Sequence, residues 1–243
     1  MKKYPVAFQR TLLPICIACI AASLALFLTT GLLSQAMAGE IEDYISKASR
    51  YIKARDYQRA IREYDAALKL DPKHPKTNLL LGLVYANMND LDKAIQYTEK
   101  ALELDPGYSA YNNLALVYAN KGDFKKSIDY YQKAIALNPS AYTPWHHLGL
   151  IYSSKKEYEK AAEHYKKAAE LNGQFAEAYV GLGSALYYSG DKAGALAQVK
   201  KLKELKFKMQ GEGLEEWIND KEKKSQAATT TPSSTPPSRS APG

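Results

Sequence analysis

Residues 145–152 read WHHLGLIY, and this stretch decides the fold when it is placed beside its neighbours along the chain. Trp145, Leu148, Gly149 and Tyr152 fall at i, i+3, i+4 and i+7, so they share one face of a helix. A second segment follows and ends at Leu171-Asn172-Gly173. We therefore expect a helix, a turn and a second helix within about 34 residues.

The same pattern recurs along the chain. Three segments end in Leu-Asp-Pro or Leu-Asn-Pro, and Pro72, Pro106 and Pro139 are 34 and 33 residues apart. The residue before a proline is pushed out of the α region, so each ending stops a helix. A fixed period of this length is typical of a helical repeat array, in which neighbouring units stack to bury a continuous core.

The repeated residues resemble the tetratricopeptide repeat (TPR), whose pattern is Trp-x2-Leu-Gly-x2-Tyr, then Ala-x3-Phe, then Pro. The resemblance implies an all-α, right-handed superhelical solenoid of about five helix–turn–helix units over residues 41–209. The predicted units are 41–74, 75–107, 108–141, 142–175 and 176–209. Units 1 and 5 match least well, as is typical of terminal repeats.

The turn inside each unit carries an acidic residue that can cap the second helix. Four units have an aspartate there, preceded by Arg, Asn or Gly, whereas unit 4 has Lys156-Glu157. Beyond the repeats, residues 210–224 are predicted to form a helix that caps the stack through Leu214, Trp217 and Ile218. Residues 225–243 are rich in Ser, Thr and Pro, and this composition predicts disorder.

The N-terminus has the composition of an export signal. Lys2, Lys3 and Arg10 precede an apolar run over residues 12–33, and Ala36 and Ala38 form a small-x-small site. We expect residues 1–38 to be a signal peptide cleaved between Ala38 and Gly39, which places the remainder in the periplasm or outside the cell. The apolar run of 22 residues is also long enough to span a bilayer, so an uncleaved anchor is the alternative.

Composition narrows the possible functions. Both cysteines precede residue 20, so the exported part can form no disulfide and no thiolate metal site. It holds 30 basic and 26 acidic residues spread along the chain, which does not favour a nucleic-acid surface. His146 and His147 are adjacent, so they point about 100° apart on a helix and do not form a metal pair.

No phosphate loop or catalytic constellation is found, and we expect neither enzymatic activity nor a cofactor. The resemblance implies instead a non-catalytic adaptor or scaffold that binds partner peptides or helices on a concave surface lined by the first helices, in envelope or secreted assemblies. The alternative is a membrane-anchored spacer or self-associating scaffold without a peptide ligand. The family's groove positions correspond here to Leu79, Leu80, Leu83, Asn87, Asn112, Asn113, Leu116, Asn120, His146, His147, Leu150, Glu177, Tyr187 and Tyr188. These leucines could equally serve only to pack neighbouring repeats together.

Overall fold

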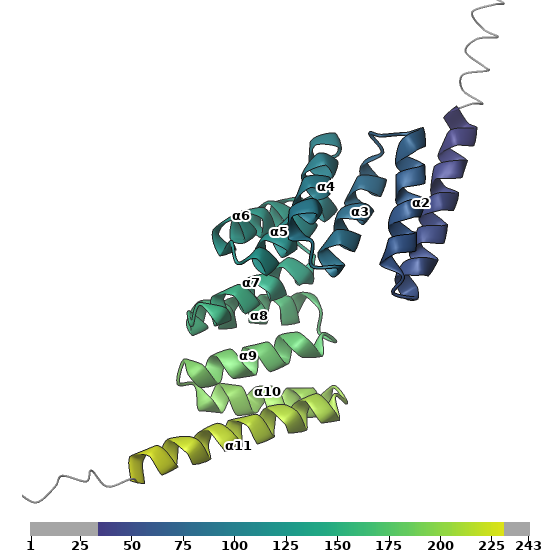
Figure 1. Ribbon diagram of the computed structural model, residues 1–243. Helices are drawn as coiled ribbons and strands as arrows, with labels where there is room; N and C mark the ends of the chain where they lie inside the picture. The colour runs from purple at the N-terminus through teal and green to yellow at the C-terminus, as the bar shows by residue number, and fades with distance from the viewer. Residues whose placement is uncertain (1–33, 231–243) are drawn as a thin grey trace, which may run out of the picture. The chain divides into compact units, whose positions relative to one another are not determined.

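The computed structural model describes residues 34–230, and every regular element in this range is an α-helix (Figure 1). Helices pair through tight turns, and the pairs follow one another along the chain. The expected all-α fold of stacked helix pairs is confirmed. The first helices of the pairs are residues 34–53, α3 (Pro75–Asn87), α5 (Tyr108–Lys121), α7 (Tyr142–Ser154) and α9 (Ala176–Tyr188). The second helices are α2 (Tyr57–Leu70), α4 (Leu91–Leu104), α6 (Phe124–Leu137), α8 (Tyr158–Leu171) and α10 (Lys192–Glu204), and α11 (Lys208–Thr230) follows them.

The chain divides into two compact units, one ending at Pro106 and the other beginning at Gly107. In the first unit, residues 34–53, α2 and α3 share a core in which Ala60, Tyr64 and Leu81 are fully buried. In the second unit, α5 contacts α7, and α7 contacts α9, so the first helices lie side by side. The second helices α6, α8 and α10 pack against these first helices.

The turns inside the helix pairs share one backbone conformation. The residue before the N-cap has a left-handed conformation, with φ of 83° at Gly122 and 94° at Gly190. Arg55, Asn89 and Lys156 adopt the same conformation, at a cost that glycine avoids. The sequence places all of these turns, but only Gly and Asn are residue types that favour the left-handed conformation.

The predicted aspartate caps are confirmed. In each of four turns an aspartate carboxylate accepts a hydrogen bond from the backbone N–H three residues later, as when Asp123 accepts from Lys126 at 3.1 Å. Asp56, Asp90 and Asp191 do the same. Glu157 makes no such cap bond, because its longer side chain turns outward to Lys155 and Lys160.

Small residues on the first helices create space for aromatic side chains of the second helices. The Tyr165 ring is 2 % exposed and lies between Gly149 and Gly181. A Cβ atom would lie 2.6 Å from the ring at Gly149 and 2.7 Å from it at Gly181, closer than packed atoms approach. The close approach of α7, α8 and α9 therefore depends on glycine at both positions.

The C-terminal helix differs from the expected one in length. α11 begins at Lys208 and extends to Thr230, whereas residues 210–224 were expected. Lys206 has φ of 67°, and the Phe207 N–H bonds to the Leu202 carbonyl at 2.9 Å, so the chain reverses and α11 packs on α10. Leu214 and Ile218 are 4 % and 0 % exposed in the core that α11 shares with α9 and α10. Residues 225–230 continue the helix, and no proline occurs between Lys208 and Thr231 to end it earlier.

The predicted export segment falls mainly outside the described residues. The structure begins at residue 34, and a continuous helix runs from there through Ala38 and Gly39 to residue 53. No helix within residues 34–230 is both long enough and apolar enough to cross a membrane. The apolar run of residues 12–33 is not part of this range.

Candidate partner-binding surface

The residues predicted for the partner-binding surface lie on the first helices, in two portions that belong to the two units. The first unit holds the portion on α3. Leu79, Leu80 and Leu83 are half-buried there, and Asn87 is exposed at the end of the helix. Leu80 also packs against the core of this unit. The α3 portion is therefore apolar, and packing accounts for part of its leucine surface.

The second unit holds the larger portion, on α5, α7 and α9. Leu116 on α5 is half-buried, whereas Leu150 on α7 is 47 % exposed. Asn112 and Asn113 are half-buried and Asn120 is exposed on the same helix as Leu116. The Asn112 Oδ1 atom is buried without a hydrogen-bond partner, so one acceptor on this helix is unsatisfied.

His146 and His147 pack mainly against aromatic rings of neighbouring elements. The His147 ring stacks on Tyr131 of α6, with centroids 5.5 Å apart and 10° between the planes. The His146 ring lies 5.6 Å from Tyr165 of α8 and 4.9 Å from Phe175. Much of both imidazoles is thus covered, and they contribute less open surface than the sequence indicated.

Burial also governs the protonation of these imidazoles. Burial, with the neighbouring His146 as a second cause, lowers the pKa of His147 to about 4. Burial lowers the pKa of His146 as well, and the charge of Glu177 on α9 partly opposes this shift. Glu177 is therefore close enough to act on His146, and both imidazoles are neutral near pH 7.

A third imidazole lies on the other side of the same helix pair. The His164 ring stacks on Tyr152 at 5.1 Å with 1° between the planes, and it lies 5.6 Å from Trp145. Burial lowers the pKa of His164. The His164 Nδ1 and Trp145 Nε1 atoms are buried without hydrogen-bond partners, so this cluster is held together by ring packing.

Tyr187 and Tyr188, at the end of α9, belong to an aromatic cluster with α8 and α11. Tyr188 is 44 % exposed and stacks on Tyr158 at 4.7 Å. Trp217 meets both Tyr187 and Tyr188 edge to face at 5.3 Å, and the Lys221 ammonium lies 5.6 Å from the Tyr188 ring. Trp217 of α11 therefore lies beside the predicted surface. The spacing of residues in the sequence did not indicate its contacts with Tyr187 and Tyr188.

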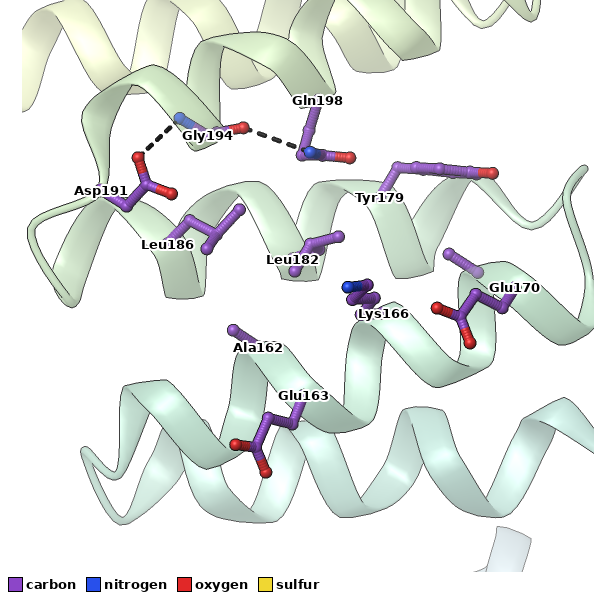
Figure 2. A pocket seen from close by; sticks show the side chains of 11 residues that line it. Ala162, Glu163, Lys166, Glu170, Tyr179, Leu182, Leu186, Asp191, Gly194 and Gln198 are labelled. Atoms are coloured by element: carbon purple, nitrogen blue, oxygen red, sulfur yellow. Dashed lines mark hydrogen bonds between the residues drawn. The ribbon is translucent and has the colours of Figure 1, made fainter.

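A cavity of about 510 Å³ lies elsewhere, between α8 and α10 and over α9 (Figure 2). None of its lining residues was predicted as a site residue. A signal was nevertheless present in the sequence, because Ala162 and Ala169 stand where the earlier repeats carry Ile or Leu. In the described part of the chain, no group of three or more His, Cys, Asp or Glu side chains could hold a metal ion.

Family models of the tetratricopeptide repeat match residues 45–109, 108–141 and 143–175, which together span more than half of the chain. The chain belongs to the tetratricopeptide-repeat family. Its fold is that of a protein-interaction scaffold, a module that is typically non-catalytic. The comparison with curated proteins gave no significant match.

Solved structures of the same fold were found. The crystal structure of MamA shares 32 % identity with a TM-score of 0.60, and the match covers 67 % of this chain and 95 % of MamA. PilW, described as a widely conserved type IV pilus biogenesis factor, shares 23 % identity with a TM-score of 0.62, over 68 % of this chain and 77 % of PilW. YrrB, described as a TPR protein with an unusual peptide-binding site, shares 22 % identity with a TM-score of 0.57, over 74 % of this chain and 98 % of YrrB. The matches to PilW and YrrB bear on the fold alone.

Proposed function

We propose that this chain is an exported adaptor that binds a peptide segment or an amphipathic helix of a partner protein on its first-helix surface. In this role it helps to assemble complexes of the cell envelope or secreted complexes. The observation that carries the proposal is Leu150, which is 47 % exposed at the middle of the α5–α7–α9 face. Nearly half of the Leu150 side chain is therefore not used in packing between repeats and is open to a partner.

The chemistry of this face suits a partner segment with one or two apolar anchors. Leu150 offers an apolar contact, and Asn113 and Asn120 offer hydrogen bonds without charge. Burying the exposed half of the Leu150 side chain against a partner contributes about 1 kcal/mol, and a segment can combine several such contacts.

The proposal is tested by Leu150→Ser, with Leu137→Ser as the matched control. Leu137 is 52 % exposed but lies on the second helix α6. We expect Leu150→Ser to remove most partner recovery when the tagged chain is purified from envelope extract of its host and the proteins bound are quantified by mass spectrometry. Leu137→Ser should leave recovery unchanged, and both variants should keep the helical circular dichroism of the parent. Equal recovery with Leu150→Ser would contradict the proposal.

Export is a separate part of the proposal. Cleavage after Ala38 would give a mature chain that begins at Gly39, in the periplasm or outside the cell. Intact mass and N-terminal sequencing of the chain from its host provide the test, because retention of Met1 would contradict cleavage.

A membrane-anchored spacer is the second candidate function. One observation favours it, namely that the helix of residues 34–53 continues without a break through the expected cleavage position. In this case the chain would fractionate with membranes and resist extraction by high salt. Leu150→Ser would then leave the recovery of co-purifying proteins unchanged.

A further inference from the structure

The cavity between α8 and α10 lies on a part of the second unit that the proposed function does not use. Its walls come from the second helices α8 and α10, and its floor comes from Leu182 and Leu186 of α9 (Figure 2). Tyr179 stands at the end of the cavity away from the α9–α10 turn. No lining residue belongs to the predicted partner-binding surface.

The sequence explains why a cavity is present at this junction of repeats. In repeat 3, Ile128 and Ile135 lie seven residues apart on α6 and pack against the core next to α7. In repeat 1, Ile61 and Leu68 have the same spacing and pack in the core of the first unit. Ala162 and Ala169 occupy the corresponding positions of α8. Two branched side chains are therefore replaced by methyl groups on one wall.

The side chains on the opposite side of the cavity, on α10 and α9, are also smaller than in the other repeats. Gly194 stands where the other four repeats carry a basic residue, namely Arg59, Lys93, Lys126 and Lys160. The Gly194 N–H donates to Asp191 Oδ1 at 2.8 Å, so the cap bond is kept although no side chain projects from this position. Leu186 also replaces the tyrosine that the other repeats have at its position. Several substitutions thus open one junction together.

The charges around the cavity are mainly negative. Glu163 and Glu170 lie on the α8 rim and Asp191 at the α10 end, whereas Lys166 is the one cationic side chain in the lining (Figure 2). Lys167, outside the lining, is 3.7 Å from Glu170 and offsets part of that charge. The rim therefore favours a ligand that carries positive charge.

We propose that this cavity is a second docking site, which takes a basic amphipathic helix of a partner protein. Two aliphatic side chains of that helix, seven residues and about 10 Å apart, would fill the space that Ile and Leu fill in the earlier repeats. Lysine or arginine residues on its flanks would face Glu163 and Asp191. Empty apolar space lowers the stability of the chain alone, so a helix that fills it gains apolar burial on binding.

The test uses two synthetic helical peptides and the full chain. The first peptide carries two isoleucines seven residues apart with lysines on both flanks, and the second has glutamates in place of the lysines. Fluorescence anisotropy of the labelled peptides measures their affinities. We expect the lysine peptide to bind at least about tenfold more tightly than the glutamate peptide, and the difference to shrink as salt rises from about 0.1 M to about 1 M.

A cavity-filling variant shows where the peptide binds. Ala162→Ile with Ala169→Leu restores the side chains of the earlier repeats, and we expect it to raise Tm by about 2–4 °C. It should weaken binding of the lysine peptide at least about tenfold, because the aliphatic side chains find no space. Leu150→Ser is the control and should leave this affinity unchanged, since Leu150 is not part of the cavity.

A charge variant keeps the proposal testable if the double substitution disturbs the fold. Glu163→Lys changes an exposed residue and should weaken binding of the lysine peptide about threefold without lowering Tm. The proposal is overturned if the lysine peptide does not bind the parent chain, or if the filled variant binds it equally well. It is also overturned if Leu150→Ser abolishes binding, because the peptide would then occupy the first-helix surface. Failure of the first-helix proposal alone leaves all of these outcomes unaffected.

Discussion

Repeats 2 and 4 fill the same place in the helix pair with side chains of very different size. In repeat 4 the Tyr165 ring of α8 lies between two glycines, Gly149 and Gly181. In repeat 2 the corresponding residue of α4 is Thr98, which is 1 % exposed and lies against one glycine, Gly82. The glycine on the first helix is thus needed in both repeats, but it faces a ring in one and a small branched side chain in the other.

The side chain near the start of the first helix also differs in size and polarity between these two repeats. Repeat 4 has Trp145 packed against His164, whereas repeat 2 has Asn78, which is fully buried. The Asn78 amide donates to the His74 carbonyl at 2.9 Å, so a hydrogen bond replaces ring packing. One backbone arrangement therefore accepts an aromatic or a polar interior, provided that the helices can approach closely.

The largest expected effect comes from removing the aromatic ring. Tyr165→Ala should lower the free energy of unfolding by about 3–5 kcal/mol, because neither neighbouring glycine can fill the space. Thr98→Ala should cost about 1 kcal/mol or less, since its hydroxyl has no partner to lose. Urea unfolding followed by circular dichroism measures both, and equal losses would show that the two sites are packed alike.

The second effect is a pH dependence confined to repeat 4. The pKa of His147 is about 4 in the folded chain and about 6.5 when unfolded, so the unfolded state binds more protons between these values. Stability is therefore complete above about pH 6.5 and falls by about 3 kcal/mol as the pH drops to 4. Repeat 2 has no histidine between Pro75 and Gly107. Hydrogen exchange should show α7 losing protection in this window while α4, which contains no histidine and is capped by Asp90, keeps it.

His147→Phe provides the control for this pH dependence. Phenylalanine keeps a ring against Tyr131 and cannot be protonated, so the loss of α7 protection should become smaller. His146 and His164 also have lowered pKa values, so a remainder should persist. A full loss in the His147→Phe variant would assign the effect to those two imidazoles instead.

The third effect is steric. Gly149→Ala should cost about 1–3 kcal/mol, because the Tyr165 ring is held on its other side by Gly181 and cannot move away. Gly82→Ala should also destabilise, but Thr98→Ala in the same chain should recover part of the loss by removing the atoms that the new methyl group meets. A double-mutant cycle in urea measures this recovery. Strictly additive losses would mean that Thr98 is not the obstacle.

The smallest effect concerns the helix caps. Asp90 caps α4 through the Lys93 N–H, whereas Glu157 makes no cap bond and pairs with Lys155 and Lys160 at the surface. Asp90→Ala should lower Tm by a few degrees, and Glu157→Ala should leave it nearly unchanged, because exposed ion pairs contribute little. Glu157→Asp should raise Tm slightly by providing the shorter carboxylate that reaches the backbone. Scanning calorimetry on the three variants makes the comparison.

The repeat pattern predicted most of the fold because each unit carries its packing residues at fixed spacing. Leu114, Leu148 and Tyr131 occupy such repeated positions, and each is 2 % exposed or less. The turn conformations of Arg55 and Lys156 could not be read in the same way. Neither residue favours a left-handed backbone, which is imposed here by the closure of the helix pair.

The candidate surface was harder to predict, because helical spacing gives the direction of a side chain but not what covers it. His146 and His147 occupy groove positions of the family, yet rings from α6, α8 and the α8–α9 connection cover them. The cavity was missed for a related reason. It arises because α8, α9 and α10 each carry smaller side chains than the corresponding helices of other repeats, and no single residue indicates it.

The sequence by itself determined the family, the all-helical fold, the capped turns and the inward residues, because these follow from a local period and from chemistry within one helix pair. Only the tertiary structure decided which outward residues stay open. Leu150 is exposed while its neighbours His146 and His147 are largely covered, and Ala162, Ala169 and Gly194 leave space between helices. Exposure and empty volume depend on what neighbouring helices place against each side chain, and that is a property of the packed repeats together.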